Sequence, residues 1–172
     1  MEANTNTRTR PKPGNKARKK QKPISQQSLL AMSQKQLDDL FTKSPCGEIP
    51  VGESDGMVVL AAGSGISKQV AELARIAWRG KVFNPAGRDL KNRILPIEIR
   101  ALRAKVYMGT SRFDGKPVIV LDYKRSSPLT HWIRDEIREV APGLYLGVVY
   151  WSGRKTIDFS LYFPKQARRG QG

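Results

Sequence analysis

The chain has 172 residues, of which 39% are hydrophobic, and a formal net charge of +16. This length and composition suit one domain with a packed core, and no apolar run approaches the roughly 18 residues of a membrane-spanning helix. The single cysteine, Cys46, excludes an intramolecular disulfide, and the single histidine, His131, excludes a metal site built from several histidines.

Much of the excess positive charge lies at the two ends of the chain. Residues 1–23 hold eight Lys and Arg residues against Glu2 alone. We interpret residues 1–27 as a disordered basic tail, because they contain too few apolar side chains to offset the entropy cost of folding. The tail either only solubilises the protein or binds nucleic acid or an anionic membrane surface weakly through a basic cluster, Lys16, Arg18, Lys19, Lys20 and Lys22.

Two short helices are predicted in the first half of the chain. Ser33 and Gln36 form a capping box before an apolar helix face, which predicts a helix over residues 33–43. Ser67 is the expected N-cap of a second helix over residues 68–77. We expect both helices to cover one end or the outside of the structure that follows.

From residue 78 onward the pattern is typical of β-strands. Including one earlier segment, strands are predicted over residues 57–62, 81–83, 90–95, 99–108, 117–123, 134–140, 144–151 and 156–163. Turn dipeptides such as Asp114-Gly115 and Pro142-Gly143 join neighbouring strands and indicate antiparallel pairing. Residues 134–140 also fit a helix, but the tight Pro142-Gly143 connection favours a strand. Because no long helices alternate with the strands, a parallel α/β sheet is not expected.

Several motifs occur in a fixed order along this half of the chain. They are WRGKVF at residues 78–83, Asn92, Asp114-Gly115-Lys116, Asp122-Tyr123 and RDEIREVAPGLYLG from Arg134. Over roughly residues 45–163 the chain thereby resembles uncharacterised bacterial proteins with a lipocalin-like, calycin-type β-barrel. The resemblance implies an antiparallel barrel whose interior holds a small apolar molecule, and it implies no established activity.

The predicted fold class is therefore mainly β: an antiparallel calycin-like β-barrel with two short N-terminal helices and a disordered basic N-terminal tail. Residues 1–27 form the tail, residues 28–164 a single barrel domain with a helical N-terminal extension, and residues 165–172 a basic C-terminal tail. No apolar segment of a secretory signal follows the basic N-terminus, so we expect a cytoplasmic location.

The candidate ligand-binding residues combine aromatic side chains, expected to line the barrel interior, with charged ones that would orient a polar head group. They are Trp78, Asp122, Tyr123, Arg134, Arg138, Tyr145 and Tyr150. Residues two apart on a strand share a face, so Arg134, Glu136 and Arg138 lie on one face and Asp135, Ile137 and Glu139 on the other. Either set can face the interior. Alternatively both form weak ion pairs on the outside.

The favoured function is a non-enzymatic carrier or sensor for a small hydrophobic ligand, with no cofactor, metal or catalytic residue assigned. One alternative is nucleic-acid association through the basic tails, or through a strand carrying Arg100, Arg103 and Lys105. Another is a barrel enzyme of the isomerase or cyclase type, using Asp122 or Asp135 as acid and base. That enzyme requires a carboxylate with a raised pKa in a dry pocket that faces an aromatic wall.

Overall fold

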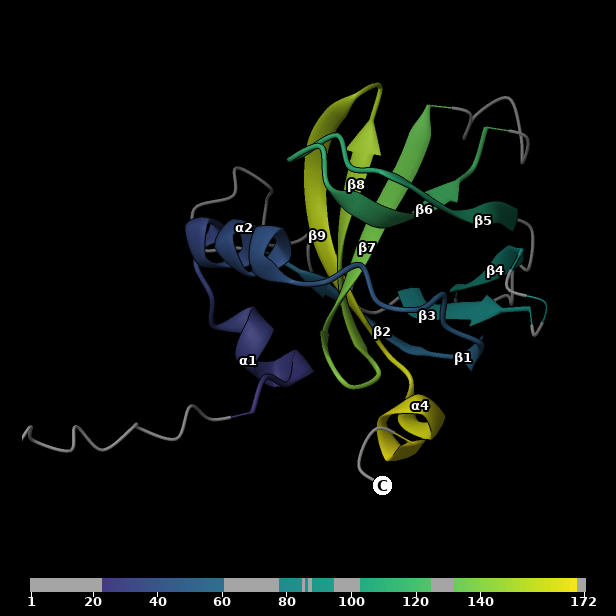
Figure 1. Cartoon of the computed structure of the whole chain (residues 1–172), viewed down its shortest axis with the longest axis horizontal. Helices are drawn as coiled ribbons and strands as arrows, with labels where there is room; N and C mark the ends of the chain where they lie inside the picture. The colour runs from purple at the N-terminus through teal and green to yellow at the C-terminus, as the bar shows by residue number, and fades with distance from the viewer. Residues whose placement is uncertain are drawn as a thin grey trace, which may run out of the picture.

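The structure is a computed structural model, and it describes residues 23–60, 78–84, 86, 88–94, 103–124 and 132–169 (Figure 1). These ranges contain nine strands in one antiparallel sheet: β1 (Gly52–Glu53), β2 (Asp55–Val59), β3 (Trp78–Phe83), β4 (Asp89–Ile94), β5 (Arg103–Thr110), β6 (Pro117–Asp122), β7 (Ile133–Ala141), β8 (Leu144–Trp151) and β9 (Arg154–Tyr162). They also contain three helices: α1 (Gln26–Leu30), α2 (Gln34–Lys43) and α4 (Pro164–Arg169).

The sheet curls into a nearly closed barrel because one chain segment pairs at both of its ends. The strand order is β1-β3-β4-β5-β6-β7-β8-β9-β2, and only Ser54 separates β1 from β2. Residues 52–59 therefore bridge β3 and β9. The Ser54 hydroxyl donates to the Lys81 carbonyl at 2.8 Å and accepts from the Lys81 N–H at 3.0 Å, which ties the junction to β3.

The junction also depends on a close contact between two glycines. A Cβ atom on Gly80 would lie 2.4 Å from the Ser54 carbonyl oxygen, and one on Gly56 would lie 2.4 Å from the Gly80 Cα. Gly80 has a φ of +125°, a backbone conformation that side chains of L-residues rarely adopt. The absence of a side chain at these positions lets the strands approach closely enough to close the barrel.

Strands β6 to β9 are buried on both faces, because the barrel interior covers one face and helices cover part of the other. Ile119, Leu121 and Ile137 belong to the interior cluster, whereas Val118 and Val120 belong to an exterior cluster that includes the apolar sides of α1 and α2. Figure 1 shows both helices beside β9 on the outside of the barrel. This two-sided burial explains why residues 144–151 are almost entirely apolar.

The helices are held to the outer face by side-chain hydrogen bonds. Gln26 donates to the Asp55 carbonyl at 3.0 Å, and Gln34 donates to the Asp158 carboxylate at 2.7 Å. Helix α2 begins after Ser33, and its capping box with Gln36 forms as predicted. Helix α1 has a capping box of its own at Ser25 and Ser28.

The mainly β, antiparallel architecture is confirmed, and so is the assignment of residues 134–140 to a strand. Three elements were not predicted: α1 begins inside the segment 1–27 assigned to the tail, β1 precedes the first predicted strand, and α4 extends from Pro164 into the predicted C-terminal tail. The predicted helix over residues 68–77 and the basic cluster of residues 16–22 lie outside the described residues. No helix within the described ranges is long and apolar enough to cross a membrane.

The glycine contact predicts a specific loss of stability. Gly80→Ala should lower the free energy of unfolding by at least about 2 kcal/mol more than Gly52→Ala, because a Cβ at residue 80 meets backbone whereas one at residue 52 meets nothing within 4 Å. Both glycines have positive φ, so an alanine at either position is strained by the backbone conformation. The difference between the two variants therefore reports the close contact at residue 80. Urea unfolding followed by circular dichroism measures the difference, and equal losses would show that the close contact is unimportant.

Candidate functional site

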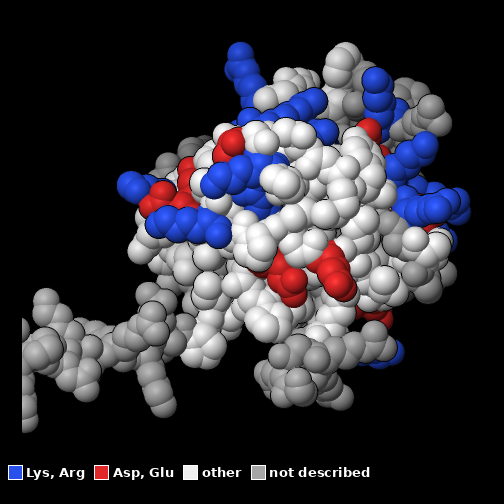
Figure 2. Space-filling model, in the orientation of Figure 1, with Lys and Arg blue, Asp and Glu red and all other residues white. Residues whose placement is uncertain are grey.

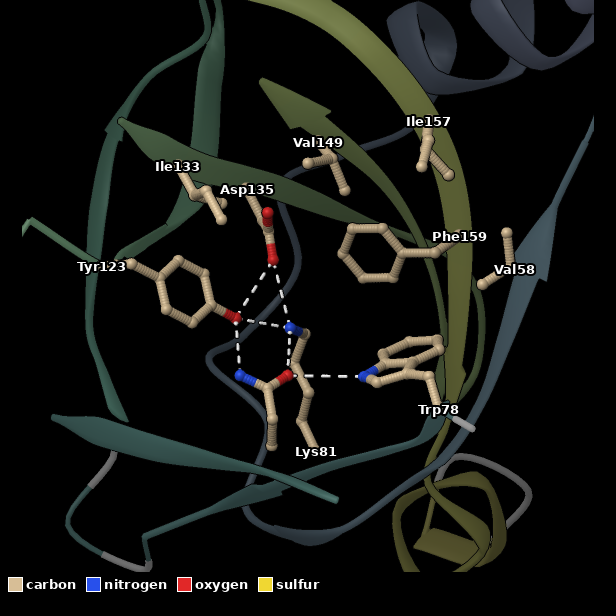
Figure 3. Close-up of a pocket in the computed structure, with 10 residues that line it drawn as sticks. Val58, Trp78, Lys81, Tyr123, Ile133, Asp135, Val149, Ile157 and Phe159 are labelled. Atoms are coloured by element: carbon tan, nitrogen blue, oxygen red, sulfur yellow. Dashed lines mark hydrogen bonds and ion pairs between the residues drawn. The ribbon is translucent and has the colours of Figure 1, made fainter. Parts of the chain in front are cut away.

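The barrel interior is filled by side chains at one end and holds a cavity at the other. Phe83, Tyr145 and Phe163 pack edge to face in the filled end. The cavity has a volume of about 220 Å³, opens to solvent, and is predominantly apolar (Figure 3). The described residues that line it are Val58, Trp78, Lys81, Asn92, Tyr123, Ile133, Asp135, Val149, Ile157 and Phe159.

A buried lysine lies at the polar side of this cavity. The Lys81 Nζ donates to Asn92 Oδ1 at 2.8 Å, to the Tyr123 hydroxyl at 2.5 Å and to Asp135 Oδ2 at 3.1 Å. The Lys81 and Asp135 side chains are only 5% and 4% exposed. Four different parts of the barrel meet here, because these residues come from β3, β4, the end of β6 and β7.

The hydrogen bonds of this cluster join its four polar side chains into one network. The Tyr123 hydroxyl accepts from Lys81 and from Asn92 Nδ2 at 3.2 Å, and it donates its own proton to Asp135 Oδ2 at 3.2 Å. Lys81 Nζ therefore faces three acceptors, which matches the three N–H donors of an ammonium group. This count fits an ammonium at Lys81 and a carboxylate at Asp135, which are the forms that their mutual attraction favours.

Burial acts on all three ionisable groups of the cluster. It lowers the pKa of Lys81 below its usual value and raises the pKa of Asp135, while the attraction between the two opposes both shifts. Burial, followed by the Asp135 charge, raises the pKa of Tyr123 well above its usual value. Tyr123 is consequently neutral at physiological pH, and the cluster as a whole carries no net charge.

Three aromatic rings surround the Lys81 ammonium. Its Nζ lies 5.4 Å from the ring centroid of Trp78, 5.2 Å from that of Tyr123 and 5.4 Å from that of Phe159. Cations are attracted to aromatic faces within about 6 Å, and the attraction strengthens when water is excluded. Ring contacts therefore help offset the cost of removing the ammonium from water.

Two local features place the aromatic wall. The β3–β4 pairing shifts register between Trp78 and Gly80, so Trp78 reaches the interior although strict alternation from Lys81 would turn it outward. A Cβ on Gly147 would lie 2.3 Å from the Phe159 ring, so the glycine makes room for this ring. Trp78 and Phe159 then pack edge to face at 5.5 Å.

The predicted ligand-binding residues do not all lie together. Trp78 and Tyr123 line the cavity, whereas Tyr145 lies in the filled end and donates to the Glu48 carbonyl at 2.8 Å. The other four lie on the outer face and away from the cavity, because alternation along β6, β7 and β8 turns them there. These are Asp122, Arg134, Arg138 and Tyr150.

The charges on the outer face of β7 are engaged with the β5–β6 turn, and Arg138 also contacts α2. Arg138 donates to both oxygens of Asp114 at 2.7 Å and to the Phe41 carbonyl of α2 at 2.9 Å. These contacts lower the pKa of Asp114 to about 2. Glu136 accepts from Ser111, from the Arg112 N–H and from Arg134, although its side chain is fully buried. This set joins α2 and the β5–β6 turn to the barrel.

Sequence reasoning did not assign Lys81 or Asn92 to the site, and it named Asp135 only as a candidate acid and base of the alternative enzyme. A signal for Lys81 was present, because it alternates with Phe83 and so places a charge on an apolar strand face. Asp135 was one of two alternatives for the inward face of β7. The apolar lining residues, such as Val149 and Ile157, look like ordinary core positions in the sequence.

Basic side chains form a separate surface feature. Figure 2 shows Lys and Arg gathered at the right-hand edge, over β4 and β5. The exposed basic residues of these strands are Lys91, Arg103 and Lys105. Nucleic-acid binding through the strand that carries Arg103 and Lys105, or through the tails, stays a prediction.

Among the described residues, no group of three or more Asp, Glu, His and Cys side chains could hold a metal ion.

No protein-family model matches the chain, and no curated protein matches it in sequence. A solved structure with a similar fold is the crystal structure of a protein from Thermomonospora curvata, at a TM-score of 0.53 and 16% identity. The match covers 76% of this chain and 87% of the other. At this level of identity the similarity concerns the fold alone.

The buried pair predicts a double-mutant result. Lys81→Met should lower the free energy of unfolding by about 3–5 kcal/mol, because it leaves the Asp135 carboxylate buried without its cation. The double variant Lys81→Met/Asp135→Leu should recover most of that loss, since it removes both charges from the interior.

Urea unfolding at pH 7 tests this expectation, with Lys91→Met on exposed β4 surface as the control, which should change stability by less than about 0.5 kcal/mol. A double variant at least as unstable as Lys81→Met would contradict a direct coupling between the two charges.

Proposed function

We propose that the protein binds a small, largely apolar molecule in the open end of its barrel. The observation that carries this proposal is the cavity itself, which has apolar walls on β2, β7, β8 and β9 and a buried polar cluster on one side. Ligand pockets combine these two features: apolar surface contributes affinity, and a few convergent polar groups orient the ligand.

The volume limits the size of the ligand. An apolar cavity of about 150 Å³ in another protein is large enough for benzene, and the present cavity is about 220 Å³. Drug-sized molecules need about 300–1,000 Å³. A molecule of one or two rings, or a short branched chain, therefore fits best. We further propose that the barrel is of the lipocalin-like kind, on the strength of the motif resemblance.

A buried acid with a raised pKa beside an aromatic wall also meets the criterion for a barrel enzyme; Asp135 meets it, whereas Asp122 does not line the cavity. We prefer binding to catalysis because the protons of Lys81 and Tyr123 are already donated within the cluster, so neither is available to polarise a substrate. Deuterium exchange at the α-carbon of acetophenone in D₂O, at a rate that Asp135→Asn abolishes, would reverse this preference.

Filling the cavity should abolish binding. Val149 lines the cavity, and Val149→Phe adds a ring to it, whereas Val82 faces outward from β3 and is 37% exposed. Ligand-observed NMR with toluene, benzyl alcohol, cyclohexanol and indole should show saturable binding of at least one compound to the original protein and to Val82→Phe. The same compound should not bind Val149→Phe.

Circular dichroism and urea unfolding establish that both variants are folded. Binding that persists unchanged in folded Val149→Phe would place the ligand elsewhere on the protein. Saturable binding of none of the four compounds would count against a small-ligand site in the barrel.

A further inference from the structure

We propose that the ligand is a neutral molecule with a hydroxyl or N–H group, and that this group donates a hydrogen bond to Asp135 Oδ1. This inference rests on the proposed function, because it names the class of molecule that the same cavity takes. The hydrogen bonds among Lys81, Asn92, Tyr123 and Asp135 point to this group, because they leave Asp135 Oδ1 without a donor among the described residues.

The two carboxylate oxygens of Asp135 have different environments. Oδ2 accepts from both Lys81 and Tyr123. Oδ1 is buried and accepts from none of the described groups. Figure 3 shows one oxygen receiving both dashed lines, while the other points toward the apolar wall that includes Ile133 and Val149. An ionised oxygen that is buried without a donor carries a large desolvation cost, so a donor brought by a ligand gains more here than in water.

Lys81 and Tyr123 have no proton to spare for an anionic ligand. All three Lys81 protons and the Tyr123 proton point to acceptors within the cluster. A carboxylate entering the cavity would bring only acceptors and would face the unpaired oxygen of Asp135. The geometry therefore disfavours fatty acids and other anions, even though a lysine lines the cavity.

The net charge of the cavity disfavours a cationic ligand as well. Lys81 and Asp135 already neutralise each other at a distance of 3.1 Å. A bound ammonium would leave a net positive charge in a predominantly apolar cavity beside the Lys81 cation, which is unfavourable at low dielectric. A neutral alcohol, phenol or N–H heterocycle supplies the donor without adding charge.

Four probes that share one ring separate these possibilities: benzyl alcohol as a neutral donor, benzyl methyl ether as its counterpart without a donor, benzylamine as a cation and benzoate as an anion. Their dissociation constants are measured on the full chain at pH 7 by ligand-observed NMR or calorimetry. We expect benzyl alcohol to bind at least about tenfold more tightly than each of the other three.

The double variant Lys81→Met/Asp135→Leu, which keeps the cavity and removes its charges, should bind the ether at least as tightly as the alcohol. The variant Lys91→Met, changed on exposed surface, should retain the preference for the alcohol.

Tighter binding of benzoate, benzylamine or the ether to the original protein would overturn the inference and leave the proposed function standing. A preference for the alcohol that survives in the double variant would also overturn it. If none of the four probes binds while toluene, cyclohexanol or indole does, the inference fails and the proposed function stands; if none of these compounds binds, the proposed function itself fails.

Discussion

The ion pair between Lys81 and Asp135 is the interaction on which the site depends. A buried ammonium has to find three acceptors, and Lys81 finds them on three other parts of the barrel. The pair therefore links β3 to β4, to the end of β6 and to β7 within the interior. Such a convergence requires a curled sheet, which the close contact of Gly56 with Gly80 and the bridging of β3 and β9 by residues 52–59 make possible.

Stability alone gives a weak reason for this pair. Burying two charges costs more desolvation energy than their attraction commonly returns, and apolar replacements are often as stable. The outer polar set of Arg138, Asp114 and Glu136 differs, because its charged groups are engaged in ordered contacts that hold α2 and a turn in place. The inner cluster instead leaves Asp135 Oδ1 unpaired beside an apolar cavity, which is the arrangement expected of a ligand site.

The general architecture was predictable because it follows from local patterns. The Asp114-Gly115 and Pro142-Gly143 turns indicated antiparallel strands, and the capping box at Ser33 indicated the start of α2. The inward direction of Asp135 could not be predicted, since both faces of β7 carry charges and both are buried. Which face is interior depends on where α1 and α2 pack, and this is a tertiary property.

The site was predictable only in part for related reasons. Trp78 and Tyr123 were assigned correctly to the cavity lining, but Trp78 reaches it through a register shift that alternation alone does not indicate. The segments quoted for the lipocalin-like resemblance also contain Lys81, Asn92 and Asp135, and the structure brings these residues together. These segments therefore held polar residues of the cavity that the choice of aromatic and charged candidates had left out.

The proposed ligand site depends on one claim, that Asp135 is an ionised carboxylate with one oxygen available to a neutral donor. Carbon-13 NMR of its side-chain carboxyl tests this directly at neutral pH, with Asp135→Asn used to assign the resonance. We predict the chemical shift of a carboxylate in the protein alone and a further, saturable change as benzyl alcohol is added. The shift of a protonated carboxyl group at pH 7, or no change at saturating benzyl alcohol, would contradict the claim.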